Sequence, residues 1–183
     1  PVEVKLDKGV YLILFDFQWM LHRWNKPLQD HPLETHNEFD VLVEISDLLE
    51  KHKNHHVILA SHHPIISYGA YGGNFSLKQH LFPLTDIDKS LYLPLPGLGS
   101  LYPIFRSTAG GRQDIANPKY KSISLALEEL LKQYDNAVYI AGHEESLQHI
   151  KKEGVNYIVS GTGSQASFVK KGKYSEFASS RTG

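Results

Sequence analysis

Residues 57–73 read V-I-L-A-S-H-H-P-I-I-S-Y-G-A-Y-G-G, and this stretch decides the fold that we expect. Its first four residues are apolar, a pattern typical of a short strand that is buried on both faces of a sheet. Pro64 cannot donate a backbone hydrogen bond, so the strand should end at His62 and His63. Open α/β sheets bind ligands at the carboxyl ends of their parallel strands, which is where both imidazoles would lie.

Other apolar runs repeat this design. Residues 137–141 form a second buried run and end in Gly142-His143-Glu144-Glu145, and residues 155–160 form a third that ends in a glycine turn. Residues 10–17 predict a further central strand, with Asp16 and Gln18 at its end. Because the carboxyl ends of parallel strands share one edge of a sheet, we expect these polar loops to lie together.

Helical signals separate the strands. Thr35 and Glu38 have the spacing of a capping box before apolar residues at helical periodicity to about residue 51. Asn117-Pro118 predicts the start of another helix, and residues 76–81 predict a short one. Residues 166–170 and 174–178 suggest a final hairpin. Alternating strands and helices indicate an α/β fold with a largely parallel sheet.

Residues 86–114 have a different character, because proline and glycine interrupt leucine, tyrosine and isoleucine there. The apolar content favours packing against the rest of the chain over flexibility. We therefore expect a long ordered loop insertion within a single domain that spans residues 1–183.

The composition excludes several classes of protein. The 183 residues include 19 basic and 20 acidic side chains, and a formal net charge of -1 lacks the positive footprint of a protein that binds duplex nucleic acid. With no cysteine, the chain has no disulfide, thiolate metal site or cysteine nucleophile. No apolar run approaches the roughly 20 residues of a membrane span.

Histidines on the ends of two strands point to a metal site. Neutral imidazole is a common ligand of zinc, iron and manganese, and carboxylate suits the harder ions. Taken singly, His62 or His143 is better explained as a hydrogen-bonded core or rim residue. Their matching glycine and proline context on two parallel strands shifts the balance toward metal binding.

Three motifs in order resemble the calcineurin-like metallophosphoesterases, in the purple acid phosphatase branch. They are L-A-S-H-H-P at 59–64, G-H-E-E-S-L-Q at 142–148 and Y-I-V-S-G-T-G at 157–163. The resemblance covers roughly residues 10–169. It implies an α/β sandwich with helices outside packed sheets, and hydrolysis of phosphate mono- or diesters by water that two metal ions activate. Iron, zinc and manganese are the divalent ions expected in the complete domain.

By this resemblance, His62 and His143 would bind one metal ion, and Glu145 stands where the family has a further histidine ligand. His63 and Tyr71 are the candidate catalytic residues, with Tyr71 at a position where many relatives carry a histidine near the scissile phosphate. Tyrosine can donate a hydrogen bond but is a poor proton shuttle at neutral pH.

The family's earlier motifs, which supply a bridging aspartate and an asparagine, are absent. The resemblance therefore implies the C-terminal part of the domain, incomplete at the N-terminus, which would self-associate or pair with an N-terminal remainder. Many relatives are exported, so the resemblance favours an extracytoplasmic location. Glu145 and Tyr71 leave a second interpretation open, namely a non-catalytic binding or interaction module that keeps the fold.

Two further sets of residues have alternative interpretations. Arg106 and Arg112 flank a glycine pair and would clamp a phosphate bidentately, or they form a solvated surface pair. Asp16 and Gln18 would orient a ligand histidine, or they are ordinary residues of the turn after a strand.

Overall fold

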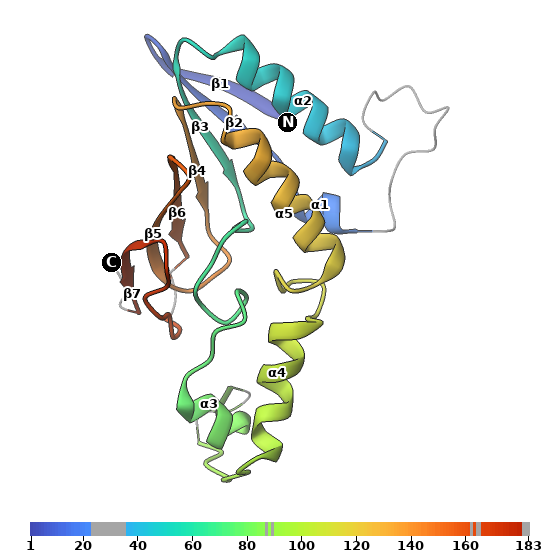
Figure 1. Ribbon diagram of the computed structural model, residues 1–183, viewed down its shortest axis with the longest axis vertical. Helices are drawn as coiled ribbons and strands as arrows, with labels where there is room; N and C mark the ends of the chain where they lie inside the picture. The colour runs from blue at the N-terminus through green and yellow to red at the C-terminus, as the bar shows by residue number, and fades with distance from the viewer. Residues whose placement is uncertain (23–35, 87, 89, 162, 164–165, 181–183) are drawn as a thin grey trace.

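The computed structural model describes residues 1–22, 36–86, 88, 90–161, 163 and 166–180 (Figure 1). The strands are β1 Val2–Asp7, β2 Val10–Leu14, β3 His56–Ser61, β4 Ala137–Ala141, β5 Leu147–Lys152, β6 Val155–Ser160 and β7 Ser175–Ser179. The α-helices are α1 Phe17–Leu21, α2 Glu38–Lys51, α3 Leu77–Leu81, α4 Leu101–Thr108 and α5 Pro118–Leu131, and the 3-10 helices are η1 Pro83–Asp86 and η2 Leu98–Ser100. Within these ranges, no helix combines the length and hydrophobicity needed to cross a membrane.

The strands form one mixed sheet in the order β1-β2-β3-β4-β6-β5-β7. The centre is parallel, because β2 pairs with β3, β3 with β4 and β4 with β6 in parallel. The edges are antiparallel, because β1 pairs with β2 and β5 pairs with both β6 and β7. The α/β class is confirmed, and the sheet is mixed as expected, but the parallel and antiparallel pairings among the described strands are equal in number where we expected a parallel majority.

One face of the sheet is buried against helices. Alternate residues of β3, β4 and β6 point to this face, among them Leu59, Tyr139 and Tyr157. They share a continuous apolar core with Ile45 of α2 and Leu127 of α5. Figure 1 shows α2 and α5 lying side by side along the sheet, and this packing fixes the positions of the strand ends.

The opposite face is apolar and partly open. Val2 of β1 pairs with Leu14 of β2, and both side chains are exposed, with 62% of Val2 accessible. At the far edge, Phe177 of β7 lies on the same face and is 52% accessible. The described residues form a single sheet, so the second packed sheet of a sandwich stays a prediction.

Several boundaries differ from those expected. The predicted strand at 10–17 ends at Leu14, because the Asp16 carboxylate accepts a hydrogen bond from the backbone N–H of Trp19 and caps α1. Helix α2 begins after Asn37, whose side chain forms a capping box with Asp40. Thr35 lies outside the described residues.

The end of the chain also pairs differently. Strand β7 pairs with β5, so the hairpin predicted from residues 166–170 and 174–178 is wrong. Strand β5 itself was not expected. It forms a hairpin with β6 through Glu153 and Gly154, which both have positive φ angles (51° and 89°), as a tight primed turn requires.

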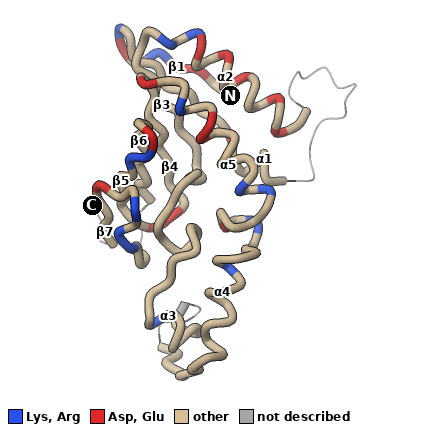
Figure 2. Tube along the Cα trace, in the orientation of Figure 1, with Lys and Arg blue, Asp and Glu red and all other residues tan. Residues whose placement is uncertain are grey.

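The prediction of a loop over residues 86–114 is wrong for its second half, which contains η2 and α4. Gly97 turns the chain with a φ of 81° before these helices begin. Pro103 is tolerated in α4 because it lies in the first turn, where the backbone N–H has no partner within the helix. Figure 2 shows that α3 and α4 carry little charge, with Lys78 on α3 and Arg106 on α4.

We expect the open apolar face to make this chain self-associate, because contiguous exposed apolar surface is rare on monomers. Light scattering over a concentration series should show this association. Leu14→Lys should shift the chain toward monomer, whereas Leu125→Lys, on an exposed position of α5, should not. A parent chain that remains a monodisperse monomer would contradict this expectation.

Candidate metal centre

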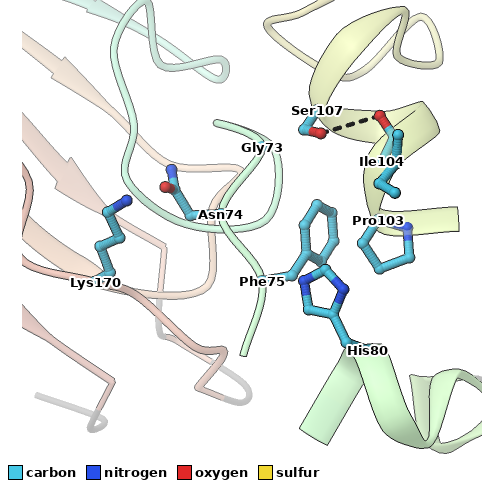
Figure 3. A pocket seen from close by; sticks show the side chains of 8 residues that line it. All are labelled: Gly73, Asn74, Phe75, His80, Pro103, Ile104, Ser107 and Lys170. Carbon is cyan, nitrogen blue, oxygen red and sulfur yellow. Dashed lines mark hydrogen bonds between the residues drawn. The ribbon is translucent and has the colours of Figure 1, made fainter. Parts of the chain in front are cut away.

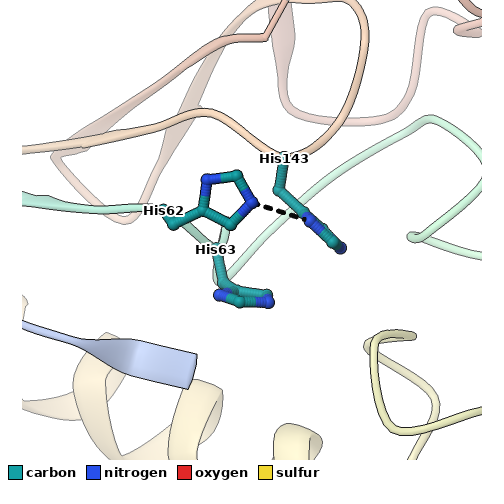
Figure 4. A group of neighbouring side chains, drawn as sticks. All are labelled: His62, His63 and His143. Carbon is teal, nitrogen blue, oxygen red and sulfur yellow. Dashed lines mark hydrogen bonds between the residues drawn. The ribbon is translucent and has the colours of Figure 1, made fainter. Parts of the chain in front are cut away.

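Three histidines meet at the ends of β3 and β4 (Figure 4). The pairing of Ser61 with Ala141 places His62 and His63 beside His143. The Nε2 atom of His62 lies 3.2 Å from Nδ1 of His143. Each imidazole offers one ligand atom such that all three lie within 4.8 Å of one another, and the described residues contain no other group of this kind. We name His62, His63 and His143 the histidine cluster.

The backbone around the cluster is held tightly. The Tyr139 hydroxyl donates a hydrogen bond to the His63 carbonyl at 2.7 Å, and the Gly142 N–H donates to the His62 carbonyl at 3.1 Å. His143 has a φ of 60°, in the left-handed region that side chains other than glycine rarely adopt. Such a conformation costs on the order of 1–3 kcal/mol and is typical of functional sites.

The imidazoles are suited to bind as neutral ligands. Burial lowers the pKa of His63, and its hydrogen bond to Gln113 acts in the opposite direction. Burial, followed by the neighbouring His63 and His62 rings, lowers the pKa of His143 to about 3, although the Gln113 carbonyl opposes this. His63 and His143 are therefore unprotonated at neutral pH, with lone pairs that a metal ion can accept.

Two buried nitrogens of the cluster have no hydrogen bond of ordinary length and angle to the described residues. They are Nδ1 of His63, a residue with only 1% of its surface accessible, and Nε2 of His143. Buried polar atoms are normally paired, so these two require an explanation. Three imidazole donors fit a zinc-like ion that keeps an open coordination position.

A chain of side-chain amides fixes the tautomer of His63. The Nε2 amide group of Gln113 donates to Oε1 of Gln18 at 2.9 Å, so the amide oxygen of Gln113 faces His63. That oxygen lies 2.6 Å from Nε2 of His63, which must therefore carry the proton. The unpartnered Nδ1 keeps its lone pair. An outer partner that fixes the tautomer in this way is typical of a metal-binding histidine.

The prediction for the turn after β2 is thus divided between its two residues. Gln18 reaches His63 through Gln113, while Asp16 caps α1 and acts on His63 only through its charge, which opposes the lowering of the pKa of that imidazole by burial.

Glu145 lies apart from the histidine cluster. Its Oε2 accepts a hydrogen bond from Ser167 Oγ at 2.6 Å, and its carbonyl accepts one from the Ser167 N–H. The third member of the candidate ligand set is therefore His63, and not Glu145 as the resemblance implied. The reason is local, because the loop after His143 turns the next side chains toward residues 67–71 and 167.

Tyr71 and Arg106 stack beside the cluster. The centroid of the Tyr71 ring is 4.0 Å from that of His143, and the Arg106 guanidinium carbon lies 4.8 Å from the Tyr71 centroid. Asp114 fixes Arg106, whose Nε donates to Oδ1 at 2.9 Å. Burial raises the pKa of Tyr71, so its hydroxyl stays protonated and can donate a hydrogen bond.

Arg112 does not join Arg106. It lines a separate small pocket with Leu21, Asn117 and Lys119, so the described structure forms no double-arginine clamp.

The sequence places Glu144 in the polar loop after β4, and the structure adds a role that the pattern did not indicate. This carboxylate is buried and accepts hydrogen bonds from Ser67 Oγ at 2.8 Å and from the backbone N–H groups of Ala70 and Tyr71 at 3.1 and 3.0 Å. It thereby fixes the turn that carries the Tyr71 ring. A β-carbon on Gly69 would lie 2.2 Å from the Glu144 carboxyl carbon, so the close approach requires glycine there.

Comparisons with known proteins show the fold alone. No family model and no curated protein matches the chain. A solved structure titled "GAP50 the anchor in the inner membrane complex of Plasmodium" is similar, with a TM-score of 0.54 and 17% sequence identity. The similarity covers 100% of this chain and 43% of that chain, so this chain spans less than half of the neighbour's length.

Removing the amide that fixes His63 should weaken metal binding. We expect Gln113→Leu to lower the affinity for zinc by about 10- to 100-fold, the usual effect of losing an outer partner. Calorimetric titration measures this, and Gln133→Leu, an exposed amide after α5, is the control. Equal affinity in Gln113→Leu and the parent would show that Gln113 does not orient a ligand.

Single substitutions should separate the cluster from Glu145. His62→Ala, His63→Ala and His143→Ala should each weaken zinc binding more than about tenfold, which corresponds to roughly 1.4 kcal/mol. Glu145→Ala should bind zinc like the parent, because its carboxylate bonds to Ser167. The reverse pattern, with Glu145→Ala impaired and His63→Ala unaffected, would restore the ligand set expected from the resemblance.

Proposed function

We propose that this chain is a metal-dependent phosphoesterase domain whose histidine cluster holds one divalent ion. The observation that carries the proposal is the convergence of three imidazoles in which two buried nitrogens have no ordinary hydrogen bond to the described residues. The ordered motifs that resemble the metallophosphoesterases support it. Zinc, manganese or iron would suit the three nitrogen donors.

Such an ion, when bound, polarises a phosphoryl oxygen and acidifies water. The chain's own residues bind and orient the ester. Tyr71, held against His143, can donate its hydroxyl hydrogen bond to a phosphate oxygen. The Arg106 guanidinium carbon lies 4.8 Å from the Tyr71 ring centroid, and Asp114 limits the movement of this side chain. Neither residue acts as a base, because the phenol and the guanidinium both stay protonated.

A second candidate is a non-catalytic module that binds a metal or a partner protein. It is favoured by the absence of a carboxylate from the only metal-suited group among the described residues, since hydrolytic two-metal sites use carboxylates. The similar solved structure is titled as an anchor in an assembly, which agrees with this second role.

Hydrolysis of 4-nitrophenyl phosphate by the zinc- or manganese-loaded chain distinguishes the phosphoesterase from the non-catalytic module. We expect slow turnover that rises with metal occupancy and falls more than about tenfold in His62→Ala. Lys121→Ala, on an exposed face of α5, serves as the control. Stoichiometric metal binding without turnover would favour the non-catalytic module, and absence of metal binding would refute both metal-based proposals.

A further inference from the structure

A cleft of about 620 Å³ lies directly beside the histidine cluster, with Tyr71 as the wall that the two share. Its other walls come from α3, α4 and the segments that hold Glu145 and Phe168. We call it the aromatic cleft. Four rings and two cations line it, namely Tyr71, Tyr92, Tyr102, Phe168, Lys78 and Arg106.

The rings of this cleft are accessible. Tyr92 is 56% accessible and Tyr102 is 51% accessible, and Phe168 is also exposed. A tyrosine that served only to fill the core would be covered, as Tyr139 and Tyr157 are. Exposed rings that line one cleft are suited to stack on a planar group, because aromatic rings attract each other beyond the area they bury.

The cations of the cleft are placed next to the rings. The Arg106 guanidinium carbon lies 5.7 Å from the centroid of Tyr102 and 4.8 Å from that of Tyr71. The Lys78 ammonium donates to the Tyr92 hydroxyl at 2.9 Å. A ligand that stacks on Tyr92 or Tyr102 therefore lies beside a positive charge, which suits an anion.

Asp114 already pairs with Arg106, so the positive charge that the cleft offers to an anion is that of Lys78. Glu144 is buried and receives three hydrogen bonds from residues 67, 70 and 71. Glu145 accepts from Ser167. Both lie at the cluster end of the cleft, because they follow His143 directly in the chain, whereas Lys78 belongs to α3.

A second, smaller pocket differs from the aromatic cleft because it does not border the histidine cluster (Figure 3). It measures about 220 Å³ and lies between α3, α4 and the segment 73–75, with Phe75, His80 and Pro103 on one side and Lys170 on the other. It shares no wall with the histidine cluster, so it offers no place for a phosphate at the metal centre.

We propose that the aromatic cleft binds the aromatic part of a phosphate ester whose phosphate lies at the histidine cluster. This inference rests on the proposed function and assigns its substrate class, phosphate esters of planar aromatic groups. Aryl phosphates and nucleoside phosphates share this chemistry. Tyr92 and Tyr102 stack on the ring, and Lys78 places a positive charge beside the ester.

Calorimetric titration of the full chain, with and without zinc, tests the assignment with four probes. They are 4-nitrophenyl phosphate, adenosine monophosphate, glycerol 3-phosphate and adenosine. We expect the two aromatic esters to bind about tenfold or more tightly than glycerol phosphate, since one stacked ring contributes a factor of this size. If 4-nitrophenyl phosphate binds more tightly, the cleft prefers a simple aryl group. If adenosine monophosphate binds more tightly, the cleft prefers a nucleoside.

Matched variants locate the binding. Tyr102→Ala, at an exposed position of α4, should reduce the preference for aromatic esters about tenfold. Lys78→Gln should weaken the binding of 4-nitrophenyl phosphate and adenosine monophosphate more than the binding of adenosine, which carries no phosphate. Phe39→Ala removes an exposed ring of α2 and should leave all affinities unchanged.

The outcomes separate this inference from the function on which it rests. Adenosine that binds without zinc, and is lost in Tyr102→Ala, supports the cleft even if the chain hydrolyses nothing. Equal binding of glycerol phosphate and the aromatic esters, in the parent and in Tyr102→Ala, overturns the assignment even if zinc binds and turnover occurs.

Discussion

The parallel pairing of β3 with β4 is the constraint on which the candidate centre depends. Because Ser61 pairs with Ala141, the residues that follow each strand emerge side by side, and His62 and His63 meet His143. The buried face of both strands, covered by α2 and α5, makes this register costly to change, since a shift by one residue would turn Leu59 and Tyr139 to the open face. Core packing thus fixes the site geometry.

Much of this arrangement was predictable from local patterns. The bounds of β4 and the start of α5 follow directly from an apolar run and from Asn117-Pro118. The expectation that the strand ends bring His62 and His143 together also agrees with the structure. These predictions agree with the structure because each depends on local sequence. An apolar run defines a strand that is buried on both faces, and a capping residue followed by proline defines the start of a helix.

The remainder depends on contacts between distant residues. Gln113 lies 50 positions from His63, and no local pattern indicates that its amide faces that ring. Glu145 has the spacing of a ligand, yet a hydrogen bond to Ser167 directs it elsewhere. Helix α4 was not predicted, because a proline such as Pro103 usually indicates a loop. It is compatible with a helix only in the first turn, and the sequence alone does not show where α4 begins.

The buried Glu144 carboxylate has a consequence for how this protein can vary. It occupies the space where any side chain on residue 69 would lie, and it also determines the position of the Tyr71 backbone. Positions 69 and 144 are therefore sterically linked although they lie 75 positions apart in the sequence. In a lineage of such proteins, a side chain at position 69 requires the Glu144 carboxylate to move or residue 144 to become shorter, so packing couples substitutions at these two positions.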